Sequence, residues 1–384
     1  MEITLTPTDR AMLTSDRPAQ RQFIPWAEPH YWGREEAYAL EALRSSWISG
    51  GPFVERLESD FAAYCGSPHM VATSNGTTAL HAAFLALGVM PGDEIVVPGF
   101  AFLAAANIAL HMNAVPVFAD VDPETWCVTA DSIAAVITSR TVGIVPVHSY
   151  GNMCDMQPIL DLAADRGLWV CEDAAEALGS TYGGKQAGTI AEIGTYSFHA
   201  TKTITTGEGG AVATRRSDLS ERMRLVRSHG VRARRYFHEA PGHNFRLTNL
   251  QAAIGCAQLE QIEPIRRERD RVYRSYVACL SALEGIRLQR MTHEVKPVVW
   301  AIALQLDESR FPQGRDAVIE QLAECGIETR PGFHAASEMP TLYSASDIPA
   351  AEAAARQVIS LPSSPTVTDA EIDFITSSLR TLSR

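Results

Sequence analysis

The sequence of 384 residues has no run of about 20 apolar residues, the length that a membrane-spanning helix needs. Its seven cysteines never stand in a Cys-x-x-Cys spacing, which argues against a zinc site and against a disulfide framework. Basic residues are also few, because 33 Lys and Arg against 45 Asp and Glu leave a net charge of −12. We therefore expect neither nucleic acid nor an anionic membrane as a partner, and no metal.

The first 22 residues also lack the apolar stretch of a signal peptide. Charged side chains stand there instead, among them Glu2, Asp9 and Arg10. We expect a short N-terminal extension at residues 1–22 on a cytoplasmic protein. Apolar residues make up 46% of the chain and charged residues 20%, which is typical of a folded globular protein. At this length the chain has room for about two domains.

The first two-thirds of the chain alternates short β-rich runs with longer helical patterns. Helical spacing occupies residues 75–87, 102–112 and 156–166, and β-rich runs occupy residues 94–97, 115–119, 141–147, 168–171 and 193–198. Strands separated by helix-length crossovers favour a parallel sheet with helices on both faces, because each crossover returns the chain to the same end. This pattern predicts a large α/β domain at residues 23–260.

The last third has a different pattern. A helical stretch at residues 249–283, interrupted by Pro264, predicts a connecting pair of helices. It is followed by a strand-like alternation at residues 298–306 and by helical patterns at residues 315–325 and 369–382. These elements predict a smaller α+β domain at residues 261–384.

Three short segments of the sequence occupy positions where proteins commonly bind ligands. Each of them also has an ordinary structural interpretation. The Ser-Asn-Gly-Thr-Thr sequence at 74–78 precedes a helix, so it is either a phosphate site or a plain N-cap. Glu172 and Asp173 end a buried strand, where α/β sheets bind ligands and where a carboxylate can also cap a helix. His148 ends the preceding strand and has the same two interpretations.

The use of lysine adds a fourth candidate. Only Lys185, Lys202 and Lys296 are lysines, against 30 arginines. Lys202 lies between a predicted strand and the glycine-rich turn at 207–210, where an amine could approach a ligand closely. An amine can lose its proton and condense with an aldehyde, which a guanidinium cannot do. A surface lysine beside a turn is the ordinary alternative.

In this order, the motifs resemble the DegT/DnrJ/EryC1/StrS family of pyridoxal phosphate (PLP)-dependent aminotransferases, most of which act on keto sugars attached to nucleotides. The resemblance is carried by EDAAEALG at 172–179 and SFHATKTITTGEGG at 197–210, with WISGGP at 47–52, the Gly76-Thr77 pair, PVH at 146–148, GHNFR at 242–246 and IETRP at 327–331. The TITTGEGG and NFRLTNLQAAIG segments resemble the branch that aminates C4 of the sugar. The resemblance implies the fold type I of PLP enzymes, with the two domains predicted above.

The resemblance also implies roles for the residues around the cofactor. Lys202 would hold PLP as an internal aldimine and move the proton through a pyridoxamine phosphate (PMP) intermediate. Asp173 would pair with the pyridine nitrogen, Phe102 would stack on the ring, and Glu176 would lie near the phenolic oxygen. The phosphate would be bound by the Gly76 and Thr77 backbone, by Ser197 and, from the neighbouring subunit, by Asn244. A homodimer with shared active sites follows from that last contact.

The remaining roles concern the substrates. Arg246 is expected to bind the carboxylate of an amino-acid donor, which the resemblance suggests is L-glutamate. His148 and Arg330 are the further candidates for substrate binding. Glu176 departs from the family pattern, since many relatives have Gln or His there. Ser337 stands where perosamine synthases usually have His, and this second departure leaves the sugar open.

We keep two other functions open at this point. One is an aminotransferase acting on a keto-inositol, which would have no nucleotide to bind. The other is a PLP-binding regulator without turnover, since a fold does not fix a function. Relatives that remove a hydroxyl group usually replace the lysine by His, and Lys202 argues against that activity.

Overall fold

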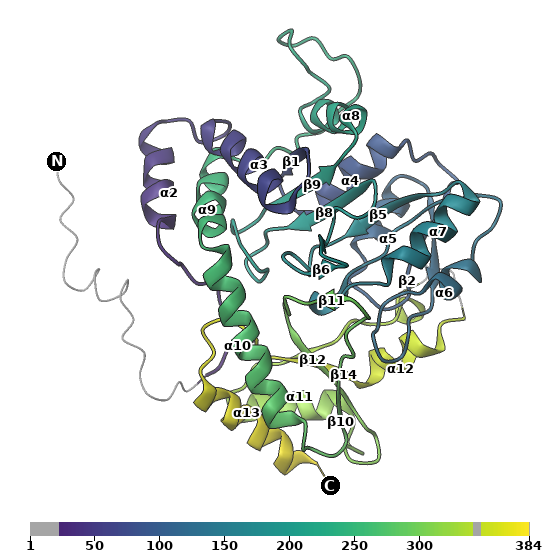
Figure 1. Cartoon of the computed structure of the whole chain (residues 1–384), viewed down its shortest axis with the longest axis vertical. Helices are drawn as coiled ribbons and strands as arrows, with labels where there is room; N and C mark the ends of the chain where they lie inside the picture. The colour runs from purple at the N-terminus through teal and green to yellow at the C-terminus, as the bar shows by residue number, and fades with distance from the viewer. Residues whose placement is uncertain (1–22, 341–346, 384) are drawn as a thin grey trace, which may run out of the picture.

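The computed structural model describes residues 23–340 and 347–383, and the predicted extension at 1–22 lies outside them. Its centre is a seven-stranded sheet (Figure 1). In spatial order the strands are β1 (His69–Thr73), β9 (Gly210–Thr214), β8 (Ile193–Ser197), β5 (Trp169–Asp173), β4 (Thr141–Ile144), β2 (Glu94–Pro98) and β3 (Val115–Ala119). Only the pairings of β9 with β1 and with β8 are antiparallel. The predicted α/β fold with a mostly parallel sheet is confirmed.

Helices cover both faces of this sheet because successive strand residues point to opposite sides. On β1, Val71 points into one apolar core, while Met70 and Ala72 point into the other. The first core is completed by α4 (Gly76–Leu87), α5 (Ala104–His111), α7 (Met156–Arg166) and α8 (Ser217–Arg227), and the second by α2 (Glu35–Arg44), α3 (Pro52–Cys65) and α9 (Asn249–Glu260). The short helix α6 (Ala130–Ala134) packs beside α7.

A second, antiparallel sheet follows in the last third of the chain. Its strands are β10 (Ile286–Leu288), β12 (Ile302–Leu306), β14 (Val358–Leu361) and β13 (Arg330–Pro331). Helices α11 (Arg315–Glu324) and α13 (Asp369–Leu382) enclose a third apolar core with this sheet, whereas α12 (Pro349–Gln357) faces the first core. A small ribbon of β11 (Val295–Lys296), β6 (Thr181–Tyr182) and β7 (Lys185–Gln186) lies at the edge of the larger unit.

Helix α10 (Ile262–Leu280) connects the two units, as Figure 1 shows. Its first turn places Ile265 in the second core, and its later turns place Val272 and Tyr276 in the third. The predicted interruption at Pro264 is wrong, because the chain breaks at Gln261 and the proline lies in the first turn of α10. A proline is tolerated there, since the N–H that it lacks would have no partner within the helix.

Two predicted strands are shorter than expected. The strand predicted at 141–147 ends at Ile144, and Val147 keeps only an isolated parallel bridge to Asp173. The strand predicted at 298–306 begins at Ile302, because Val298 N–H donates to the Ser180 hydroxyl instead of to a neighbouring strand. The sequence analysis also missed β1 and β9. The domain boundaries themselves stay a prediction, and Ile24 pairs with Ile327 beside the third core.

Across the residues that the structure describes, no helix combines the length and the apolar character needed to cross a membrane. The feature that matters for the site is the direction of the strands. Strands β1, β2, β4, β5 and β8 all run the same way, so their carboxyl ends meet at one edge of the large sheet. Open α/β sheets bind their ligands at that edge.

Candidate active site

The predicted site residues gather at the carboxyl edge of the large sheet. Asp173 is the last residue of β5, and Ser197 is the last residue of its neighbour β8. Lys202 lies in the turn that connects β8 to β9, where its N–H donates to the carbonyl oxygen of His199 at 2.9 Å. Helix α4 begins at Gly76, just after β1 ends at the same edge. The fold thus brings together segments that are more than 100 residues apart in the sequence.

The side-chain amine of Lys202 is held between an acid and an aromatic ring. Its Nζ donates to Oε1 of Glu176 at 3.3 Å, and it lies 3.5 Å from the centre of the Trp300 ring. The lysine side chain is 14% exposed, and that of Glu176 is 4% exposed. Burial lowers the pKa of Lys202, whereas Glu176 and then Asp173 raise it again, and the net direction is downward. An amine with a lowered pKa loses its proton more readily than a surface lysine.

Asp173 is a buried carboxylate without a salt bridge among the described residues. It is 5% exposed, and its Oδ1 accepts the backbone N–H of Ala175 at 3.1 Å. The pKa of Asp173 is raised to about 6, mainly because the carboxylate is buried. The hydrogen bond from the Ala175 N–H opposes this rise, and the charge of Glu176 adds to it. The positive charge of Lys202 acts in the opposite direction. A cationic ligand group placed against this carboxylate would stabilise its charged form.

Glu176 is fixed from its second oxygen as well. Its Oε2 accepts the backbone N–H of Tyr150 at 3.0 Å. Tyr150 adopts φ of 62°, the left-handed region that a residue with a side chain seldom occupies. Such strain persists only where the surroundings enforce it, and it is common at functional sites. The buried Tyr150 ring stacks on the Trp300 ring at 6.5 Å between centroids.

The start of α4 forms a cradle of backbone and hydroxyl groups. Asn75 caps the helix by accepting the N–H of Thr78 at 2.8 Å, which leaves the N–H groups of Gly76 and Thr77 as the first donors of the helix. A Cβ added to Gly76 would lie 3.0 Å from the Cβ of Ser197. A Cβ added to Gly210 would lie 2.5 Å from the Asn75 carbonyl oxygen. Glycines therefore permit this close approach, and a helix start of this kind attracts phosphate.

Phe102 follows the carboxyl end of β2 and is 64% exposed. Most large apolar side chains of this size are buried, so a bare ring beside a polar site is a surface that a flat ligand could cover. The structure therefore leaves the ring of Phe102 uncovered, and its stacking role stays a prediction.

The substrate role predicted for His148 does not fit its position. The side chain is completely buried, and its Nδ1 accepts the backbone N–H of Cys154 at 3.3 Å. The proton of the neutral ring therefore sits on Nε2, which donates to Oε2 of Glu172 at 3.1 Å. Glu172 also accepts the N–H groups of Gly188, Ile190 and Ala191. His148 and Glu172 thus fix the turn at residues 188–191. Of the two carboxylates at the end of β5, only Asp173 remains a candidate for binding a ligand.

Asn244 and Arg246 lie on the outside of the subunit. Both residues are exposed, and Nε of Arg246 donates to Oδ1 of Asn244 at 3.1 Å. The backbone of the same segment is fixed to the site, because the carbonyl oxygen of Phe245 accepts the Ser74 N–H at 2.8 Å. Within the described residues no hydrogen bond joins either side chain to Lys202 or Asp173. The phosphate and donor roles of these two side chains therefore stay predictions.

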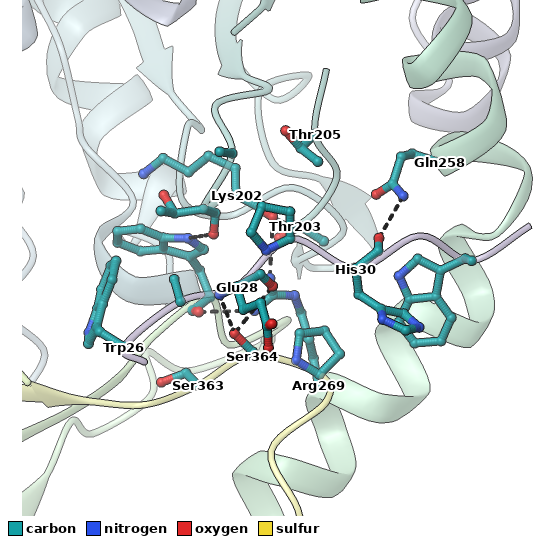
Figure 2. Close-up of a pocket in the computed structure, with 17 residues that line it drawn as sticks. Trp26, Glu28, His30, Lys202, Thr203, Thr205, Gln258, Arg269, Ser363 and Ser364 are labelled. Atoms are coloured by element: carbon teal, nitrogen blue, oxygen red, sulfur yellow. Dashed lines mark hydrogen bonds between the residues drawn. The ribbon is translucent and has the colours of Figure 1, made fainter. Parts of the chain in front are cut away.

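Arg330 is separated from Lys202 by two aromatic rings. Its guanidinium carbon lies 5.6 Å from the centre of the Trp26 ring, which meets the Trp300 ring edge-on at 5.6 Å. Trp26 and Lys202 line one pocket, shown in Figure 2, together with Arg269 and residues 363–365. An ion pair with Glu328 at 2.6 Å holds the guanidinium of Arg330 in place. Ser337, the departure noted above, donates to Oε1 of Glu352 at 2.7 Å.

The sequence analysis missed Trp300, Tyr150 and Arg269. Arg269 belongs to the charged helix pattern of α10, which looked like a solvated face, yet the residue is 5% exposed. Trp300 stands before a strand and carries no motif. Tyr150 carries no sequence signal either, since it lies six residues after β4 ends at Ile144 and its positive φ is a property of the folded chain.

Comparisons with known proteins agree with this geometry. Residues 32–380 match the model of the DegT/DnrJ/EryC1/StrS aminotransferase family. The GDP-perosamine synthase of Caulobacter vibrioides is 42% identical over 362 residues, which are 93% of this chain and 97% of the relative.

Two solved structures extend the comparison. The aminotransferase TlmJ of Streptoalloteichus hindustanus is 31% identical with a TM-score of 0.88, over 93% of this chain and 98% of that chain. Spr1654 of Streptococcus pneumoniae, solved in a PMP form, is 25% identical with a TM-score of 0.88, over 94% and 98% of the two chains. The predicted fold and the predicted cofactor are therefore confirmed at the level of the family.

The buried carboxylate of Asp173 predicts a pH-dependent stability for the protein without cofactor. The folded-state pKa of about 6 lies above the ordinary 3.8, so burying the charged carboxylate destabilises the folded protein. This cost in free energy of unfolding is absent below about pH 4, where the carboxylate is protonated in both states, and is fully present above about pH 6. Asp173→Asn removes the charge and keeps the Ala175 contact. We expect it to stabilise the cofactor-free protein by up to about 3 kcal/mol at neutral pH, with no gain at about pH 4. Urea unfolding across this pH range measures the difference.

The exposed Asp165→Asn is the matched control for this series and should leave the free energy of unfolding unchanged. Equal stability of Asp173→Asn and the unaltered protein at neutral pH would contradict the assignment of a buried, unpaired charge.

Proposed function

Because the chain belongs to the DegT/DnrJ/EryC1/StrS aminotransferase family, we propose that it moves an amino group from L-glutamate to the 4-keto group of a nucleotide-linked deoxy sugar. The observation that carries this proposal is the buried amine of Lys202, held by Glu176 beside Asp173 at the carboxyl edge of the sheet. A sugar aminotransferase needs one amine that can lose its proton and one carboxylate to balance a cationic ring, and these two residues have those properties.

The residues present fit PLP. The amine of Lys202 can condense with an aldehyde, and the start of α4 with Ser197 offers N–H and hydroxyl donors to a phosphate. Phe102 offers an uncovered ring for stacking. The protonated pyridine ring of PLP would bring an opposite charge to Asp173, which forms no salt bridge within the described residues. When bound, PLP supplies an electron sink that carries the amino group between the two substrates.

The chain's own residues then divide the work between proton transfer and orientation. Lys202, with a pKa below that of an ordinary lysine, accepts a proton at Nζ and returns it at the next step. Asp173 would keep a proton on the ring nitrogen of the bound cofactor, because its buried carboxylate forms no salt bridge within the described residues and a cation there would balance its charge. Glu176, fixed by the Tyr150 N–H, keeps Nζ close to the reacting atoms. The Trp300 ring, whose centre lies 3.5 Å from Nζ, excludes water from that side of the amine.

A nucleotide sugar is the proposed acceptor because the relative at 42% identity is a GDP-perosamine synthase. The position of Arg330 supports such a ligand, since its guanidinium lies beside the ring of Trp26, which lines the Lys202 pocket. A guanidinium beside an aromatic ring can bind a phosphate and stack a base at the same time. Ser337, which stands where perosamine synthases usually have His, donates to Glu352. We therefore name no single sugar.

A homodimer with shared sites is the proposed assembly. Asn244 and Arg246 face outward, where they would reach the phosphate and the donor carboxylate of a second subunit. Apolar side chains are also exposed on a separate segment, among them Leu43, Trp47 and Ile48, and the Ile48 carbonyl oxygen accepts an N–H from the start of α9. Burying such side chains against a symmetric copy would be favourable.

The donor half of the reaction gives the first test. Adding L-glutamate to the cofactor-loaded enzyme should bleach the visible absorbance and release 2-oxoglutarate in a stoichiometric amount, because the amino group stays on the cofactor. Lys202→Ala should show neither change, while Lys185→Ala, at an exposed position, should behave as the unaltered enzyme. An absorbance that persists with every amino acid tried would favour a PLP-binding regulator.

The nucleotide is tested by thermal unfolding. GDP or another nucleoside diphosphate that binds the folded chain should raise Tm, with a gain of about 3 kcal/mol at 100 times its Kd. Arg330→Ala should reduce that shift, whereas the exposed Arg166→Ala should not. A protein that is stabilised by an inositol and by no nucleotide at millimolar concentration would instead be a keto-inositol aminotransferase.

The shared site is tested with hybrid dimers. Lys202→Ala and Asn244→Asp are each expected to be inactive, the first without its amine and the second with a charge that repels phosphate. In a mixed dimer one site carries both changes and the other carries neither. Refolding the two variants together should therefore restore about a quarter of the activity per subunit. A mixture as inactive as its parts would show that each site is built from one subunit.

A further inference from the structure

We propose that Arg269 is a positioning residue for Lys202: its guanidinium ties the carbonyl oxygens of Lys202 and Trp300 together and so holds the lysine amine over the indole ring. The inference rests on the role of Lys202 in the proposed function. It assigns a task to a buried arginine of α10 that the transfer reaction described above does not use.

The contacts of Arg269 support a role in fixing the turn. Its Nη1 donates to the Trp300 carbonyl oxygen at 3.0 Å, and its Nη2 donates to the Lys202 carbonyl oxygen at 3.3 Å. Both acceptors lie far from α10 in sequence, so the rigid fork joins three separate segments of the chain. Figure 2 shows Lys202 and Arg269 among the side chains that line the same pocket.

Trp300 closes the frame on the other side of the turn. Its indole Nε1 donates to the carbonyl oxygen of Thr201 at 2.6 Å, next to the lysine. The face of the same ring lies 3.5 Å from Nζ of Lys202. Trp300 thus holds the carbonyl oxygen of Thr201, and Arg269 holds the carbonyl oxygen of the next residue, Lys202. Arg269 also holds the backbone of Trp300 itself. Displacing the guanidinium would release the lysine backbone and the ring together.

The charge of Arg269 adds a second effect on the lysine. Arg269 is 5% exposed, forms no ion pair within residues 23–340 and 347–383, and leaves its buried Nε without a hydrogen-bond partner there. Burial alone lowers the pKa of Arg269 to about 10. The charged groups that act on the lysine amine are Glu176 and Asp173, which raise its pKa, and Arg269, which lowers it. An arginine in this place therefore favours the neutral, reactive amine.

A purely structural arginine would tie α10 to the turn without affecting the amine. The pH dependence of Lys202 separates the two roles, and the sequence makes it easy to measure. The chain has only three lysines, and both others, Lys185 and Lys296, are exposed. Competitive acetylation of the cofactor-free full chain at a series of pH values, followed by peptide mass spectrometry, gives the pKa of each amine in the same sample.

The test compares Arg269→Met and Arg269→Lys with Arg274→Met, an exposed arginine of the same helix whose partner is Asp270. Arg269→Met should raise the acetylation pKa of Lys202 by about 1 unit, because a buried positive charge is lost. It should also lower kcat of the loaded enzyme about tenfold or more, with KM changed less than twofold. Arg269→Lys keeps the charge but loses the fork, so the pKa should stay while kcat still falls.

An acetylation pKa for Lys202 in Arg269→Met that equals the value in Arg274→Met, together with an unchanged kcat, would overturn the inference. Should Arg269→Met fail to fold, wild-type kcat in Arg269→Lys would overturn it as well. Should neither variant fold, Arg269→Gln keeps a side-chain N–H donor without the charge, and an acetylation pKa of Lys202 there equal to that in Arg274→Met would overturn the inference. The acetylation experiments need no cofactor, so they stand even where Lys202 proves not to take part in transfer.

Discussion

The buried amine of Lys202 is the constraint on which the rest of the site depends. An amine taken out of water is costly unless opposite charge lies close by, and Glu176 and Asp173 supply that charge. The two carboxylates are buried in their turn, and the pKa of Asp173 rises to about 6 for that reason. Lys202 and Asp173 are therefore held away from their ordinary protonation equilibria, which suits a site that must take up and return protons.

The topology of the large sheet places these groups within reach of one another. Strands β5 and β8 are parallel neighbours, so Asp173 and the turn after Ser197 leave the sheet at the same edge. The turn must then fold back far enough to place Lys202 beside Glu176. Arg269 and Trp300, which come from the last third of the chain, hold it in that position. The large sheet thus supplies the charged groups, and the residues after it supply the frame around them.

Sequence patterns predicted the strand-end carboxylate, the helix start at Gly76 and the lysine before the glycine-rich turn, because each is a local feature. They could not separate the two carboxylates at 172 and 173. Only the structure shows that Glu172 accepts hydrogen bonds from three backbone N–H groups and from Nε2 of His148. Arg269 and Trp300 were missed for a related reason, since their task depends on contacts across about 70 and 100 residues of sequence.

The most direct measurement for the central claim is to reduce the cofactor-loaded protein with borohydride and to map the modified peptide. Reduction makes the bond between the PLP aldehyde and its lysine permanent, so mass spectrometry identifies the residue. The account predicts the cofactor on Lys202 alone of the three lysines. Attachment to Lys185 or Lys296, or no attachment under conditions in which PLP absorbs visibly, would contradict it.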